Sequence, residues 1–105
     1  MKALKLFAGP KAFEHIQRNS LRAEHIGVIP GAAGGPKGLI LGPLDRFIFG
    51  EWLPQSDQPI DLVGASIGAW RMATACLNDS VHSLKKLEHD YIHQHYDVQP
   101  GQKRP

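Results

Sequence analysis

Residues 60–70 read IDLVGASIGAW and contain the pattern G-x-S-x-G between Gly64 and Gly68. A short apolar run precedes the serine, and good helix formers follow it. This order predicts a strand, a tight turn and a helix. Ser66, at the centre, is then one of two things. It is a nucleophile held in a strained turn, or a small residue that lets helix and strand approach each other.

Short apolar runs alternate with helical patterns along the rest of the chain. We expect strands at 3–8, 26–29 and 60–64, and helices at 10–19, from about Pro43, at 67–77 and at 81–96. Strands that alternate with helices predict a parallel sheet, and parallel sheets are covered on both faces. We therefore predict an α/β fold of three-layer α/β/α type, of which residues 1–96 form an incomplete N-terminal part with about three strands. Residues 97–105 form a polar tail that we predict to be disordered.

Composition limits the class of protein. The 105 residues suffice for at most one domain, and a 42% hydrophobic content allows a core. A formal charge of +2 argues against a nucleic-acid partner. The single Cys76 excludes an internal disulfide and fits a reducing compartment. No apolar run reaches the about 20 residues of a membrane span, and Lys5 interrupts the apolar N-terminus. We expect a cytoplasmic protein.

A second motif, GAAGGPKG at residues 31–38, also lies between an expected strand and an expected helix. Such a glycine-rich turn presents backbone N–H groups to an anion. The phosphate-binding loop of nucleotide-binding proteins does not fit, because Pro36 replaces its glycine and Gly38 replaces its Ser or Thr. The dinucleotide-binding fingerprint is also missing.

Together, residues 33–38 and 64–68 resemble the patatin-like phospholipase family. In that family a G-G-G-x-R/K-G oxyanion loop and a G-x-S-x-G elbow follow successive strands. The resemblance extends from the first expected strand to Tyr96 and includes LDRFIFGEWL at residues 44–53. It implies a Ser–Asp dyad that hydrolyses acyl esters of lipids without a metal or other cofactor. It also implies a lipid or acyl-ester substrate and transient contact with a membrane surface.

The resemblance assigns a role to each motif residue. Ser66 would attack the acyl carbonyl, and the N–H groups of Gly34 and Gly35 would hold the oxyanion. Lys37 would brace the loop. The implied oxyanion-loop residues are Gly34, Gly35, Lys37 and Gly38, and the implied elbow glycines are Gly64 and Gly68.

Two departures from the family pattern matter. Ala33 stands at the first glycine of the loop, which is tolerable only if this residue needs no positive φ. The family's aspartate lies in an Asp-Gly pair after the elbow, and no aspartate of this chain precedes a glycine. We therefore expect the base to lie outside this chain, and the segment to be inactive alone. A Ser–acid–His triad has no room after Ser66.

Three alternatives remain open. The first is a non-catalytic patatin-like domain that acts by homo-oligomerisation or partner binding through open sheet edges. The second is a zinc site on the helical pair His89 and His93, with His82 or His95 as third ligand, against a plain solvated helix face. The third concerns aromatic residues, which would line an acyl pocket or pack in the core. We favour the core for residues 47, 49 and 52, and packing against the sheet for Trp70.

Overall fold

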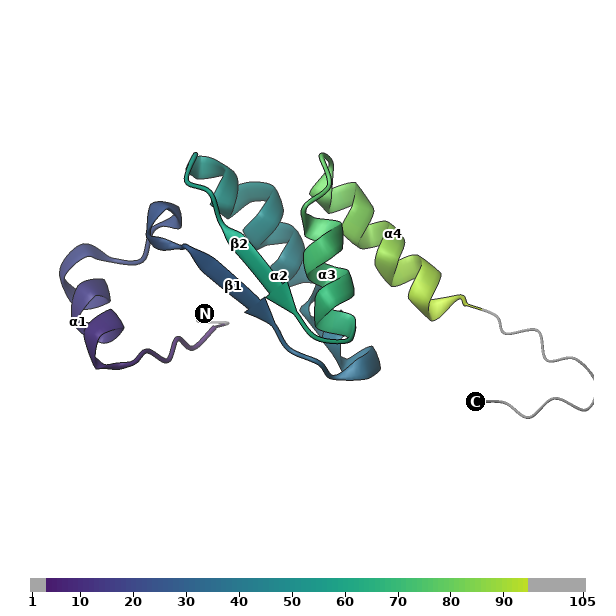
Figure 1. Cartoon of the computed structure of the whole chain (residues 1–105), viewed down its shortest axis with the longest axis horizontal. Helices are drawn as coiled ribbons and strands as arrows, with labels where there is room; N and C mark the ends of the chain where they lie inside the picture. The colour runs from purple at the N-terminus through teal and green to yellow at the C-terminus, as the bar shows by residue number, and fades with distance from the viewer. Residues whose placement is uncertain (1–3, 95–105) are drawn as a thin grey trace, which may run out of the picture.

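The computed structural model of the chain describes residues 4–94. In chain order its main elements are α1 (Pro10–Asn19), β1 (Val28–Gly31), α2 (Gly42–Phe47), β2 (Asp61–Gly64), α3 (Ile67–Ala75) and α4 (Ser80–Ile92). Short 3-10 turns cover residues 23–25, 35–41 and 53–55, and a π turn covers 48–52. The order of strands and helices confirms the mixed α/β class (Figure 1).

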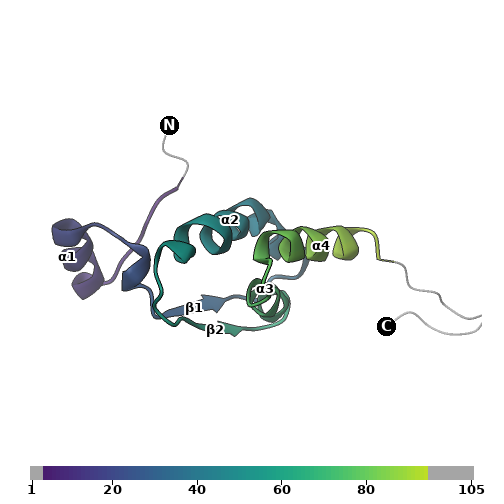
Figure 2. The same cartoon turned by 90° about the horizontal axis from the view of Figure 1, so that it is seen from above.

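The two strands pair in parallel, with Val28 opposite Asp61 and Gly31 opposite Gly64. Side chains alternate between faces along each strand. Helices α2, α3 and α4 lie on one side of the pair, and α3 lies nearest to it (Figure 2). On the other face, Val28 and Val63 are 58% and 59% exposed. The described sheet is thus covered on one face.

The expected strand at residues 3–8 is wrong where the structure describes it. Residues 4–9 form neither helix nor strand, and the Phe7 side chain is 91% exposed. A strand needs a paired edge, and this segment leads instead into α1, which lies away from the sheet in both views (Figures 1 and 2). The sheet between residues 4 and 94 therefore has two strands rather than about three.

The expected helices are present, and their boundaries follow local chemistry. α3 ends at Ala75 rather than at 77, and α4 ends before the expected end at 96. Pro10 starts α1 and Pro43 lies in the first turn of α2, where a fixed φ and a missing N–H cost nothing. α4 starts after Asp79, whose carboxylate accepts the His82 N–H at 3.1 Å. The helix ends at Ile92, and the predictions for Tyr96 and for the tail 97–105 lie outside the described residues.

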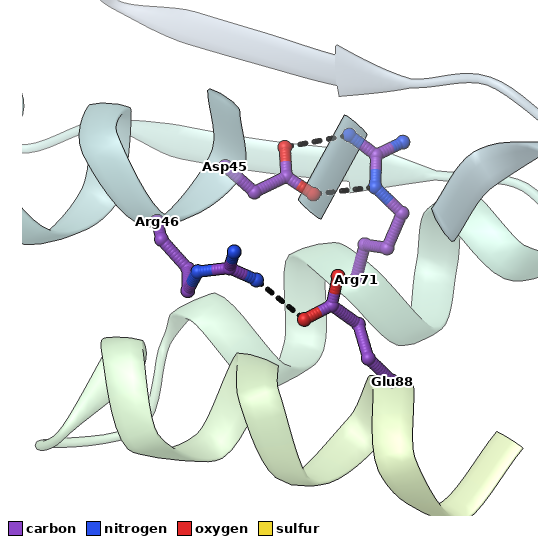
Figure 3. Close-up of polar contacts among 4 residues, drawn as sticks. All are labelled: Asp45, Arg46, Arg71 and Glu88. Atoms are coloured by element: carbon purple, nitrogen blue, oxygen red, sulfur yellow. Dashed lines mark hydrogen bonds and ion pairs between the residues drawn. The ribbon is translucent and has the colours of Figure 1, made fainter. Parts of the chain in front are cut away.

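The core is small and contains buried charge. Within residues 4–94 the buried apolar side chains are Ala23, Leu53, Ile67, Met72 and Leu84. Beside them, Arg71 of α3 donates to both carboxylate oxygens of Asp45 of α2, each at 2.7 Å. Arg46 of α2 pairs with Glu88 of α4 (Figure 3). Ion pairs therefore connect α2 to both other helices of the layer.

None of the helices among the described residues combines the length and the apolar character that crossing a bilayer requires.

Candidate active site

Ser66 lies in a strained turn between a strand and a helix. It follows β2 and caps the N-terminus of α3 with φ 55° and ψ −125°, a conformation that non-glycine residues rarely adopt. Such a residue costs about 1–3 kcal/mol, and it persists only where its surroundings impose it. The side chain is exposed and makes no capping hydrogen bond. The Ser66 hydroxyl is therefore available to a ligand.

The two elbow glycines are required by close backbone contacts. A Cβ on Gly64 would lie 2.5 Å from the N and Cα atoms of Ala69, and one on Gly68 would collide with the Gly31 carbonyl. These contacts alone fit a small-residue turn as well as an elbow. The positive φ of Ser66 is an additional feature, because a turn that needed only a small residue could place glycine there without steric cost.

The glycine loop lies beside the elbow because β1 and β2 are parallel and end at the same edge. The Ala65 N–H donates to the Gly31 carbonyl at 3.1 Å, and a Cβ on Gly38 would lie 2.8 Å from Ile67 Cγ2. The structure thus brings together two motifs that residues 39–63 separate in the sequence. Gly38 is required here for its contact with the residue that follows Ser66.

The loop offers hydrogen-bond donors. Gly35 has φ +55°, and within the described residues the N–H groups of Gly34 and Gly35 donate to no protein acceptor. The Lys37 N–H donates to the Gly34 carbonyl at 3.2 Å, so the Lys37 backbone closes the loop while its side chain is exposed. Ala33 has no positive φ, so the alanine is tolerated. A hollow of about 390 Å³ lies against this loop.

The Ile67 N–H is a donor that the sequence reasoning missed. Ile67 is the first residue of α3, and its N–H makes no hydrogen bond within the part of the chain that the structure describes. In nucleophile elbows the N–H after the serine commonly faces the oxyanion. The signal was its position in the motif, directly after Ser66.

Arg71 is the second residue that the sequence reasoning missed. It lines the hollow beside the loop and is 7% exposed. The hydrogen bonds that it donates to Asp45 raise the pKa of Arg71 above its usual value, so the guanidinium stays charged. A single arginine in the apolar helix sequence IGAWRMATACL is a signal for a buried partner, because arginine is rarely buried unpaired.

No aspartate between residues 4 and 94 hydrogen-bonds Ser66. Asp45 is held by Arg71, Asp79 caps α4, and Asp90 pairs with Lys86 at 3.0 Å. Asp61 begins β2, at the opposite end of the strand from the elbow. Asp57 lies in the loop before that strand, and Asp97 lies outside the described residues.

Within residues 4–94, His89 and His93 have no third zinc ligand beside them. The rings of His89 and His93 stack with centroids 4.2 Å apart, and His93 Nδ1 lies 2.9 Å from the His89 carbonyl oxygen. Over residues 4–94, no group of three or more potential ligands comes together, so His82 does not complete a set. His95 lies outside the described range.

The aromatic predictions are partly wrong. Trp70 does not pack against the sheet: it is 67% exposed. Met72 is the α3 residue that packs against β1. Its Cγ is so close to Gly31 that a Cβ added there would lie only 3.0 Å from it. Phe47 is 49% exposed, while Phe49 and Trp52 are half-buried.

No protein-family model matches this chain, and neither a curated protein nor a solved structure matches it.

Proposed function

We propose that this chain carries the nucleophile and the oxyanion loop of a patatin-like serine hydrolase that cleaves acyl esters of lipids. The observation that carries the proposal is the positive φ of Ser66 at the start of a helix. Beside it lies a loop whose Gly34 and Gly35 N–H groups donate to no acceptor among the described residues. The two ordered motifs support the family. In this proposal, residues 4–94 belong to a three-layer α/β/α domain whose remaining layer covers the exposed face of β1 and β2.

In the proposed reaction, the Ser66 oxygen forms a bond to the acyl carbonyl carbon. The carbonyl π bond opens, and its electron pair becomes an oxyanion that the N–H groups of Gly34, Gly35 and Ile67 stabilise, together with the positive end of the α3 dipole. The serine proton passes to an aspartate supplied from outside the described residues. The oxyanion re-forms the carbonyl as the bond from its carbon to the ester oxygen breaks, and the aspartate gives the proton to that oxygen, which leaves as the alcohol. Water then attacks the acyl-serine carbonyl and gives a proton to the aspartate; the bond to the Ser66 oxygen breaks, that oxygen takes the proton back, and the acyl group leaves as a carboxylic acid. The reaction uses no metal and no other cofactor.

We also propose that the protein works in the cytoplasm and meets its lipid substrate at a membrane surface. The exposed, unpaired thiol of Cys76 supports a reducing compartment.

An alkyl fluorophosphonate tests the nucleophile directly. Attack forms a bond from the Ser66 oxygen to phosphorus, expels fluoride and gives the serine proton to a solvent base. We expect slow labelling of Ser66, which acetate added as a substitute base accelerates and which Ser66→Ala abolishes.

Ser20 is the matched control for this labelling. It also has a positive φ, of 59°, but it caps the C-terminal end of α1 and has no oxyanion loop beside it. Peptide mapping should therefore find the label on Ser66 and not on Ser20. Equal labelling of both serines, or no label on Ser66 in folded chain, would refute the proposal.

The second candidate is an association domain without catalysis. It is favoured by the exposed apolar side chains on the open face of the sheet, Val28 and Val63, and on the free face of α1, Phe13. In that case the chain forms a homo-oligomer, and Ser66 stays unlabelled.

A further inference from the structure

A groove between α3 and α4 begins one residue after Ser66. Its first part is a hollow of about 480 Å³. The lining residues are Ile67, Trp70, Leu87, Asp90, Tyr91 and Gln94. The volume is within the range of small-ligand sites, about 300–1,000 Å³. Most of these side chains are apolar or aromatic.

The groove continues along α3 away from the nucleophile. A second hollow, of about 220 Å³, shares Trp70, Leu87 and Asp90 with the first and extends to Leu77. The two helices diverge from the connection between them (Figure 1), and the larger hollow is the one nearer Ser66. At a rise of about 1.5 Å per residue, α3 from Ile67 to Ala75 is about 12 Å long, and Leu77 lies just beyond its end. The two hollows therefore form one long, narrow groove, whose wider end lies at Ile67, the residue that follows Ser66 in the chain.

The charges on the groove neutralise each other. Lys86 and Asp90 are the charged residues of its lining, and they pair at 3.0 Å on the exposed side of α4. The hydrogen bond from the Lys86 ammonium holds the pKa of Asp90 below its usual value, so the Asp90 carboxylate stays ionised near neutral pH. Trp70 lies where the hollows meet, and it is 67% exposed. The groove thus offers apolar contact without a net charge.

We propose that this groove binds the acyl chain of the ester that Ser66 attacks, with Trp70 as the residue that sets the preferred chain length. This inference rests on the proposed function for the place of the carbonyl group. An aliphatic chain fits for two reasons: the lining is apolar and neutral, and the groove starts at the residue next to the nucleophile. The ester carbonyl then lies at the oxyanion loop, and the hydrocarbon extends past Trp70 toward Leu77.

Binding is measured without catalysis in the Ser66→Ala variant. Since the chain has two tryptophans, Trp52→Phe leaves Trp70 as the single fluorophore. Laurate, below the concentration at which it forms micelles, should shift the Trp70 emission to the blue and saturate. Butyrate at the same concentration should not. Absence of a shift with laurate overturns the proposal. So does a dimer whose formation requires Trp70, because a second copy would then occupy the groove.

Chain-length preference is measured on Ser66 itself in the full chain. A fluorophosphonate with a dodecyl tail should label Ser66 faster than one with a methyl tail. Trp70→Ser should lower this ratio about tenfold, the factor that corresponds to roughly 1.4 kcal/mol of lost apolar contact. Phe13→Ser is the matched control, because Phe13 is an exposed aromatic on α1, and it should leave the ratio unchanged.

The two measurements separate the groove from the nucleophile. Laurate binding at Trp70 without any label on Ser66 contradicts the proposed function and supports an apolar chain site. Equal labelling by both tails without laurate binding supports the nucleophile and overturns the groove.

Discussion

Ser66 is the residue at which local preference and observed structure disagree most. A serine has a Cβ that resists positive φ, yet this serine has φ 55°. Its neighbours impose the conformation, because Gly64 lets β2 and Gly68 lets β1 approach the backbone of α3 with almost no space between them. The sequence pattern predicted the turn and the need for both glycines. It could not show that the strain falls on the serine, since φ depends on how α3 packs on β1.

Replacement of Ser66 measures this strain. Ser66→Gly should be about 1 kcal/mol more stable than Ser66→Ala, because glycine adopts positive φ without a steric cost. Ser83, inside α4, is the control, and there the glycine variant should be about 1 kcal/mol less stable than the alanine variant. Urea unfolding of the four variants checks the opposite signs. The same sign at both sites would show that Ser66 carries no strain.

At the scale of elements, ion pairs organise the helical layer. α2 contacts α3 through Asp45 and Arg71, which are 4% and 7% exposed, and contacts α4 through Arg46 and Glu88. The sequence predicted these helices from apolar spacing and proline positions, which are local signals. It could not predict the pairs, because Asp45 and Arg71 lie on different elements whose packing no local pattern specifies.

Asp45→Ala should lower the free energy of unfolding by about 3–5 kcal/mol, because it leaves the buried Arg71 guanidinium without its partner. Combining it with Arg71→Leu should recover part of the loss. The exposed pair of Arg18 and Glu14 on α1 is the control, and Arg18→Ala should change stability by less than about 1 kcal/mol. Thermal and urea unfolding measure both. Equal losses at the two pairs would contradict the role assigned to Asp45.

The failed strand at residues 3–8 shows the limit of pattern reading at this scale. Leu4 and Leu6 lie on either side of Lys5, which is the alternation expected of a strand. Alternation alone does not supply a neighbouring strand with which to form hydrogen bonds. In the structure both side chains are exposed, at 59% and 67%, and the segment leads into α1 without a partner. Strand formation depends on tertiary contacts that lie outside the segment itself.

At the scale of the molecule, fewer large apolar side chains are buried than are exposed to solvent. Five apolar side chains are buried among residues 4–94, whereas twelve large hydrophobic residues are exposed. A chain of this size with so little burial has a small free energy of unfolding. Covering the open face of the sheet would then add a substantial part of the total stability.

The unfolding temperature should accordingly rise with protein concentration if copies of the chain cover each other's open sheet face. Val63→Lys places a charge on that face and should remove the concentration dependence without lowering the melting temperature of the dilute chain, because Val63 is 59% exposed. Calorimetry and light scattering measure the two effects. If the chain is monomeric at all concentrations, the hypothesis that it acts by homo-oligomerisation is rejected. The hydrolase proposal is unaffected by that result.

The parallel pairing of β1 with β2 also has a consequence for the time at which Ser66 acquires its conformation. Val28 pairs with Asp61, 33 positions later (61 − 28), so the sheet closes only after the whole intervening segment is available. Parallel pairing of strands so far apart in the sequence is slow compared with helix formation. Since Gly68 must contact Gly31 before φ of Ser66 is fixed, a chain emerging from the ribosome carries an ordinary, unstrained serine until α3 has docked. We therefore expect the positive φ of Ser66 to be among the last features to form, after both strands are in register.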